Sequence, residues 1–326
     1  MSKITVALAA AVTLPVVAEA QSAVSIQEWP VPWENTRPRD PFVDRQGIVW
    51  FVGQTGHYVG RFDPSTAEFR KFDLEPGTGP HNLIVDDAGI IWYAGNRAAH
   101  IGRLDPATGE IRKYPMPESV PDPHTLVFDR SGNIWFTAQR AGVVGRFVPS
   151  TGDVRAVKMA TQDSRPYGIV VAGDKVWFNQ FGTTKVGSLD PASFAVTDFD
   201  LPHQRSRGRR IEVTRDGGVW YVDYARGKLA RLDPATRSVE EFDAPGGASS
   251  LPYALAQDDK GRLWYVETGV RPNRLVGFDP ATKAVVATAD IPSGAGAVRH
   301  MVFHPATRSI WFGTDANTIG RARLPQ

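Results

Sequence analysis

The sequence has 326 residues, of which 42% are hydrophobic and 22% are charged, and this balance excludes a disordered or collagen-like chain. Its 37 Lys and Arg residues nearly balance its 35 Asp and Glu residues, and the basic residues are scattered, so we expect no nucleic-acid partner. The absence of cysteine excludes disulfides, thiolate zinc sites and iron–sulfur clusters.

The start of the chain has the pattern of a secretory signal peptide. Lys3 precedes an apolar run over residues 4–17, and Ala-Glu-Ala at positions 18–20 has the small-x-small form of a cleavage site. The run is too short to span a bilayer, and the alternative is a first buried strand or helix. We assign residues 1–20 to the signal peptide and residues 21–326 to a single domain. The pattern predicts a periplasmic or secreted protein with no membrane span after cleavage.

Seven pairs of Trp followed by another aromatic residue recur after this segment, at spacings of 42 to 47 residues. Short alternating apolar segments and a period in the forties are typical of a β-propeller blade with four antiparallel strands. Seven pairs therefore predict an all-β fold, a seven-bladed β-propeller. The pairs are Trp50-Phe51, Trp92-Tyr93, Trp135-Phe136, Trp177-Phe178, Trp220-Tyr221, Trp264-Tyr265 and Trp311-Phe312.

Each repeat contains the same elements, which are clearest in residues 81–117. An inner strand over residues 82–85 leads to an Asp-x-x-Gly turn at residues 86–89, and the strand with the Trp-aromatic pair follows. A third strand carries Gly102-Arg103 and ends in an Asp-Pro turn at Asp105, which reverses the chain into the outer strand.

The last repeat has no room for an outer strand, because the chain stops at Gln326 shortly after the third strand. Residues 25–32, at the other end of the domain, have the pattern of the other outer strands. We therefore predict that the N-terminal strand pairs with the last blade and closes the ring, which removes a free sheet edge.

The run Pro80-His81, Trp92-Tyr93, Ile101-Gly102-Arg103-Leu104 and Tyr114-Pro115, repeated through residues 25–326, resembles the virginiamycin B lyase (streptogramin lyase) family. The resemblance implies a seven-bladed propeller that opens a cyclic depsipeptide by elimination across its ester, with the help of a magnesium ion. The family pattern has a His that opens an inner strand, a Glu 14 residues later and a His three residues further on. Here His300 matches the first position, whereas positions 314 and 317 are Thr and Asn.

The resemblance implies His300 as the catalytic base, with Asp315 in place of the missing Glu, and Glu267 as the acid that the preceding blade keeps. Independently of the resemblance, the residue 11 before each Trp, or 10 in the fourth repeat, should line one rim of the channel, and all seven are His, Arg or Tyr. Convergent polar groups at a concave rim predict a ligand-binding site. These residues are Arg39, His81, His124, Tyr167, Arg209, Tyr253 and His300.

The residues three after each Trp approach the same rim, and two of them, Asp223 and Glu267, are candidate metal ligands. The alternative is that Arg209 neutralises both carboxylates. Two hypotheses for the function follow. The first is a metal-assisted lyase that acts on a cyclic peptide or ester, and the second is a non-catalytic propeller that binds a small ligand or a protein at the same rim. In either case we expect a monomer.

Overall fold

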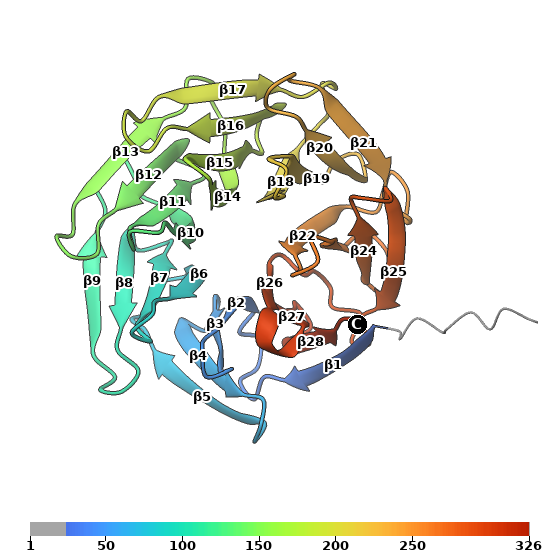
Figure 1. Ribbon diagram of the computed structural model, residues 1–326. Helices are drawn as coiled ribbons and strands as arrows, with labels where there is room; N and C mark the ends of the chain where they lie inside the picture. The colour runs from blue at the N-terminus through green and yellow to red at the C-terminus, as the bar shows by residue number, and fades with distance from the viewer. Residues whose placement is uncertain (1–23, 326) are drawn as a thin grey trace, which may run out of the picture.

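The computed structural model describes residues 24–325 and arranges them as seven four-stranded antiparallel sheets around a central channel (Figure 1). The predicted signal peptide, residues 1–20, lies outside the described residues. The described part of the chain contains no helix long and apolar enough to cross a membrane.

Each blade runs from an inner strand at the channel to an outer strand at the periphery (Figure 1). The first three blades are β2 Pro38–Val43, β3 Val49–Gly53, β4 Tyr58–Asp63 and β5 Glu68–Asp73; β6 Pro80–Val85, β7 Ile91–Gly95, β8 His100–Leu104 and β9 Ile111–Pro115; and β10 Pro123–Phe128, β11 Ile134–Ala138, β12 Val143–Phe147 and β13 Val154–Lys158.

The next three blades repeat this order. They are β14 Pro166–Ala172, β15 Lys175–Gln180, β16 Lys185–Leu189 and β17 Val196–Asp200; β18 Gly208–Val213, β19 Val219–Asp223, β20 Lys228–Leu232 and β21 Val239–Asp243; and β22 Pro252–Gln257, β23 Leu263–Glu267, β24 Arg274–Asp279 and β25 Ala284–Asp290. The last blade has β26 Met301–His304, the 3₁₀ turn Pro305–Thr307, β27 Ser309–Gly313, β28 Thr318–Arg323 and, as its outer strand, β1 Ser25–Pro30.

The predicted closure is confirmed, because β1 pairs antiparallel with β28 from Ser25 opposite Arg323 to Pro30 opposite Thr318. Trp29 stacks on Trp311, with ring centroids 5.7 Å apart. The Glu28 carboxylate accepts hydrogen bonds from the Ser293 backbone N–H at 2.7 Å and from the Thr318 hydroxyl at 2.6 Å. The two ends of the domain therefore lie in one blade (Figure 1).

The two members of each Trp-aromatic pair face opposite neighbouring blades. Trp50 packs with Leu83 of the next blade, whereas Phe51 packs with Trp311 of the last blade. The alternation of side chains along a strand produces this arrangement. The pairs thus form the core between blades.

The Asp of each Asp-x-x-Gly turn also holds the Trp six residues later. One Asp44 oxygen accepts from the backbone N–H groups of Gln46 and Ile48, both at 2.9 Å, and the other accepts from Trp50 Nε1 at 2.7 Å. Asp86, Asp129 and Asp258 bind their Trp residues in the same way. The turn is thereby fixed to the core that it borders.

Candidate functional site

The seven rim residues come together, but they fill the channel instead of lining an open mouth; we call them the channel ring. The rings of His81 and His124 have centroids 3.6 Å apart, and those of His124 and Tyr167 are 4.5 Å apart. The hydroxyl groups of Tyr167 and Tyr253 form a hydrogen bond between blades four and six. Arg39, His81, His124, Tyr167 and Tyr253 are each at most 6% exposed. The channel ring is therefore a polar plug.

The start of each inner strand places these residues. In five blades this strand begins with a Pro, whose missing N–H and fixed φ suit the first position of a strand, and the next residue belongs to the channel ring. In the fifth blade Gly208 takes the place of the Pro, and in the last blade His300 immediately precedes β26.

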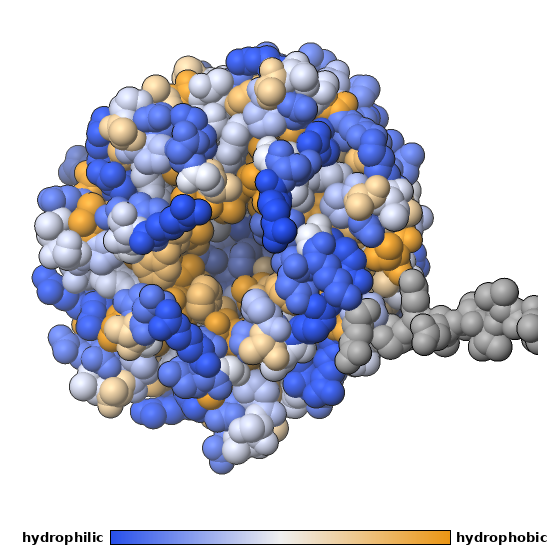
Figure 2. Space-filling model, in the orientation of Figure 1, coloured by the Kyte–Doolittle hydropathy of each residue, from blue (hydrophilic) through white to orange (hydrophobic). Residues whose placement is uncertain are grey.

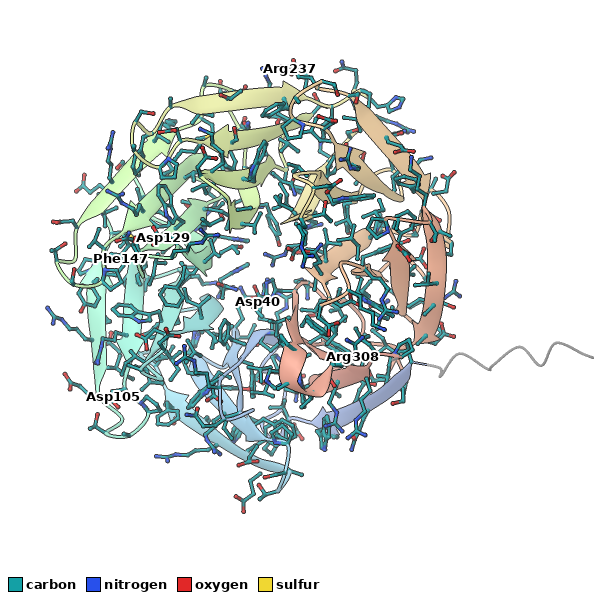
Figure 3. The ribbon with its side chains drawn as sticks, viewed as in Figure 1. Asp40, Asp105, Asp129, Phe147, Arg237 and Arg308 are labelled. Carbon is teal, nitrogen blue, oxygen red and sulfur yellow. The ribbon has the colours of Figure 1, made fainter. Side chains whose placement is uncertain are left out.

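An ion-pair network supports the plug one residue further along the inner strands. Arg39 Nε donates to Asp40 Oδ1 at 2.9 Å, and Arg210 donates to Asp40 Oδ2 at 3.3 Å. Asn82 also donates to Asp40 Oδ2, at 3.2 Å. Asp40 lies next to the channel in Figure 3. Burial opposes ionisation of this carboxyl, but Arg39 and Arg210 outweigh it and hold the pKa of Asp40 well below its usual range.

The sequence reasoning missed this second layer, although a signal for it existed. The same spacing rule, moved one residue along, selects one residue per blade, and four of the seven are polar or charged. They are Asp40, Asn82, Thr125, Gly168, Arg210, Ala254 and Met301.

We expect Asp40→Ala to cost about 3–5 kcal/mol of the free energy of unfolding, because it leaves the guanidinium groups of Arg39 and Arg210 buried with no carboxylate between them. Urea denaturation of both proteins at pH 7 measures this loss. Asp73→Ala is the matched control, since Asp73 forms an exposed pair with Lys71 and should cost less than about 1 kcal/mol. Equal losses in the two variants would contradict a structural role for the network.

The three histidines of the channel ring are held neutral. Burial, followed by the charges of Arg39 and Arg210, lowers the pKa of His81 and of His124 well below the usual value, and burial together with Arg210 lowers that of His300 to about 4. His124 Nδ1 contacts the Thr125 hydroxyl at 2.9 Å, whereas the Nδ1 atoms of His81 and His300 have no hydrogen-bond partner among residues 24–325. A base whose pKa is far below neutrality accepts a proton weakly.

Arg209 is the channel-ring residue with an aromatic environment. Its guanidinium carbon lies 3.8 Å from the ring centroid of Tyr253, 4.2 Å from that of Tyr224, 4.4 Å from that of Phe181 and 5.1 Å from that of Tyr167. Among the described residues Arg209 forms no ion pair, and its Nε has no hydrogen-bond partner. Arg209, Phe181 and Tyr224 are all partly exposed. This cluster presents free N–H donors and aromatic faces at the end of the channel where the inner strands begin.

The residues three after each Trp reach the same end, as expected. Glu267 pairs with Pro252 and Asp223 pairs with Gly208, each one residue before a channel-ring position. Both carboxylates are fully buried, and each holds a loop: Glu267 accepts from the Gly246 N–H at 2.6 Å and Asp223 from the Arg207 N–H at 2.9 Å.

The sequence suggested Arg209 as the group that neutralises Asp223 and Glu267, but other arginines lie beside these carboxylates. Arg274 lies 3.8 Å from Glu267 and Arg226 lies 3.5 Å from Asp223, whereas Arg209 pairs with neither in the part of the chain that the structure describes. Burial, stronger than the opposing bond from Gly246 and the charge of Arg274, raises the pKa of Glu267.

The residues fit a divalent cation poorly. Within the described part of the chain, Asp223 and Glu267 each keep one oxygen without a hydrogen-bond partner, but a guanidinium group lies within 4 Å of each carboxylate and would repel a cation. Residues 24–325 contain no group of three or more His, Asp or Glu side chains placed to hold a metal ion. The magnesium ion that the resemblance implies stays a prediction.

The positions at which the family pattern has Glu and His have structural roles here. Thr314 exchanges a hydroxyl hydrogen bond with Thr318 at 2.7 Å, and the Asn317 side chain donates to the carbonyl groups of Val31 and Trp33 at 3.1 and 2.8 Å. Asp315 forms ion pairs with Arg299 and, at 3.4 Å, with Arg37. Asp315 therefore contacts arginines, and Asn317 fastens the segment that follows β1.

Comparisons with known proteins agree with this architecture. The model of the Virginiamycin B lyase family matches residues 9–270. Selenomethionine-substituted virginiamycin B lyase from Staphylococcus aureus is 22% identical, with 92% of this chain and 99% of that chain covered and a TM-score of 0.83. A structure of streptogramin B lyase is also 22% identical, with 94% and 100% covered and a TM-score of 0.84.

A third similar structure is a catalytically inactive form of the S. aureus lyase with quinupristin, again 22% identical, with 92% and 99% covered and a TM-score of 0.83. A search of curated proteins finds no similar sequence. The likeness to the solved structures is a likeness of fold.

Proposed function

Because the chain belongs to the virginiamycin B lyase family, we propose that it is an exported, monomeric propeller that binds a compact cyclic peptide or ester at the end of the channel where the inner strands begin, without rapid elimination. The observation that carries this proposal is the Arg209 cluster, in which a guanidinium group with no ion pair lies among four aromatic rings. Export rests on the signal pattern of residues 1–20 alone.

The chemistry of this cluster suits such a ligand. Guanidinium N–H groups donate to carbonyl oxygens, which a cyclic peptide or ester presents around its ring, and the half-buried faces of Phe181 and Tyr224 accept aromatic or apolar side chains. Arg37 and Arg299, which share Asp315, are nearby positive groups on the loops before β2 and β26. The Arg209 cluster therefore contains both kinds of group that such a ligand requires, N–H donors and aromatic faces.

Elimination is the second candidate, and the Nδ1 atom of His300, which has no hydrogen-bond partner among the described residues, favours it. In that reaction a base takes the proton from a carbon beside a carbonyl, a carbon–carbon double bond forms, and the ester C–O bond breaks so that the carboxylate leaves with the electron pair. His300 accepts the proton weakly because its pKa is about 4, and no carboxylate stands at position 314 to assist it.

Calorimetry and mass analysis with quinupristin, the ligand of the similar S. aureus structure, test both candidates. We expect saturable binding that Arg209→Gln weakens at least 10-fold, because the variant removes the charge and three of the five N–H donors. Arg205→Gln is the matched control, since Arg205 is exposed in the same arginine-rich segment. We expect no ring opening on the timescale of binding, with or without magnesium.

Two outcomes would count against the proposal. Binding that is absent, or equal in wild type and Arg209→Gln, would remove the assigned site. Rapid opening to an isomer of unchanged mass, lost in His300→Ala, would make the protein a lyase, whereas a product heavier by one water would indicate hydrolysis.

A further inference from the structure

The channel is hollow on the other side of the plug. This cavity, which we call the channel hollow, has a volume of about 370 Å³ and is lined by the inner strands of all seven blades. Figure 2 shows it as a depression with a largely apolar wall at the centre of the visible face. Its volume lies in the range of small-molecule sites.

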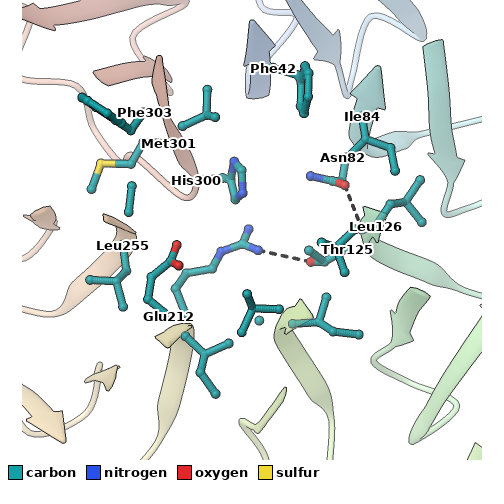
Figure 4. Close-up of a pocket in the computed structure, with 18 of the residues that line it drawn as sticks. Phe42, Asn82, Ile84, Thr125, Leu126, Glu212, Leu255, His300, Met301 and Phe303 are labelled. Atoms are coloured by element: carbon teal, nitrogen blue, oxygen red, sulfur yellow. Dashed lines mark hydrogen bonds between the residues drawn. The ribbon is translucent and has the colours of Figure 1, made fainter. Parts of the chain in front are cut away.

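One residue per blade shapes the wall, three residues after each channel-ring position. Six of the seven are apolar and the seventh is a carboxylate. They are Phe42, Ile84, Val127, Val170, Glu212, Ala256 and Phe303. The wall is thus an apolar ring with one acidic side chain on β18, and Figure 4 shows Glu212 among the residues that line the cavity.

Glu212 has no partner in the part of the chain that the structure describes, where it forms neither a hydrogen bond nor an ion pair. Arg210, two residues earlier on the same strand, is already engaged: it donates to the Arg299 carbonyl at 2.9 Å, to Thr125 at 3.2 Å and to Asp40 at 3.3 Å. Burial alone raises the pKa of Glu212 to about 8. An acid that is costly to ionise in the empty protein, in a cavity with no other free charge, needs a function outside folding.

We propose that the channel hollow binds a small organic cation with an apolar body, whose ammonium group lies against Glu212. The apolar ring buries the body of such a ligand, and the carboxylate supplies the one charge that has no partner. An anion of the same shape would meet Glu212 and find Arg210 occupied, and a neutral analogue would lose the charged pair. This site is separate from the Arg209 cluster, because Arg209 belongs to the channel ring, whereas Glu212 lies three residues further along β18 and lines the cavity on the other side of that ring.

The pH dependence of binding follows from Glu212. The charged or titratable groups near the hollow are Arg210 on β18, His300 before β26 and Asp40 on β2, and the lining residues of β6, β10, β14 and β22 contribute none. At pH 6 about 1% of Glu212 is ionised and at pH 8 about half, whereas an alkylamine stays protonated to about pH 10. The affinity for a cation should therefore rise roughly 50-fold from pH 6 to pH 8.

Calorimetry with three probes of one shape tests this inference: 2-phenylethylamine, 2-phenylethanol and phenylacetate. At pH 8 we expect saturable binding of the amine and at least 10-fold weaker binding of the other two. Glu212→Gln should weaken amine binding at least 10-fold and abolish its rise with pH. Glu240→Gln is the matched control, because Glu240 lies on the outer strand β21 and pairs with Lys283.

A second variant and a stability measurement guard the interpretation. Val170→Trp, which fills part of the hollow, should weaken binding of all three probes, and the melting temperature of Glu212→Gln should not fall, since its carboxylate has no partner to lose. Quinupristin binding should be the same in Glu212→Gln and wild type. The inference is overturned if millimolar amine gives no saturable heat, if the alcohol binds as tightly as the amine, or if Glu212→Gln leaves amine affinity unchanged.

Discussion

A protein that starts at Trp33 should lose about 5 kcal/mol or more of its free energy of unfolding, because it lacks the outer strand of the last blade. Without β1, the backbone edge of β28 from Thr318 to Arg323 has no partner strand. Trp311 and Phe62 also lose Trp29, whose ring centroid lies 5.7 and 5.0 Å from theirs. A loss of this size is comparable with the whole stability of many domains.

Thermal unfolding of the shortened chain beside one that starts at Val24 measures the effect, and we expect a decrease of at least about 10 °C in the melting temperature. Trp29→Ala should account for about 3 kcal/mol of the loss, since it removes the aromatic contacts and keeps the backbone pairing. Glu34→Ala, an exposed residue just beyond β1, is the matched control. An unchanged melting temperature after removal of β1 would mean that the closure contributes no stability.

The blade count and the closure could be predicted because both follow from the number and spacing of the sequence repeats. The Trp period fixes the number of blades, and residues 25–32 repeat the outer-strand pattern and could be assigned to the last blade. The hydrogen bond from Trp Nε1 to the turn Asp was within reach as well, since an Asp stands six residues before the Trp in four repeats. The repeat spacing and the pattern of each strand in the sequence determine these features.

The ring of channel residues was predicted as a set, but its burial was not. Whether seven side chains line a mouth or fill it depends on the channel radius and on contacts between distant residues, such as the bond between the hydroxyl groups of Tyr167 and Tyr253. The partners of Asp223 and Glu267 are loop N–H groups and arginines on neighbouring strands, which a spacing rule does not contain. The sequence could not place Glu212 in a separate cavity, because that placement depends on the side chains of the channel ring filling one end of the channel.

The second large effect should be a steep loss of stability in mild acid. His81, His124 and His300 stay neutral in the folded protein because burial and the nearby arginines lower their pKa values, to about 4 for His300. In the unfolded chain all three take up protons near pH 6.5. Their contribution to stability is therefore fully present above pH 6.5 and is lost as the pH falls below it, toward the lowered values.

Each histidine that stays neutral in the folded protein contributes a slope of up to about 1.4 kcal/mol per pH unit, so the three contribute at most about 4 kcal/mol per pH unit. Glu212 acts in the opposite direction, because its pKa is raised to about 8 and the folded protein holds its proton between about pH 4.5 and 8. Glu267, whose pKa burial also raises, acts in the same direction as Glu212, whereas His100 and His304, whose pKa values burial lowers, act with the histidines of the channel ring. The net slope between pH 6 and pH 5 should thus be positive, so that the protein is less stable at the lower pH. Asp40 adds to the loss of stability only below about pH 4, because there its carboxyl takes up a proton in the unfolded chain while it stays ionised in the folded protein.

Urea denaturation at pH 7.5, 6.0 and 5.0 measures this slope. His300→Asn should reduce the slope by about 1.4 kcal/mol per pH unit, and Glu212→Gln should increase the slope by about the same amount. Each variant removes one group whose pKa differs between the folded and unfolded states. Gln204→Asn is the matched control, since Gln204 is exposed on a loop and carries no titratable group. A slope near zero in wild type would mean that the histidines of the channel ring take up protons in the folded state. The opposite changes of slope in His300→Asn and Glu212→Gln would separate the contribution of the channel ring from that of the channel hollow.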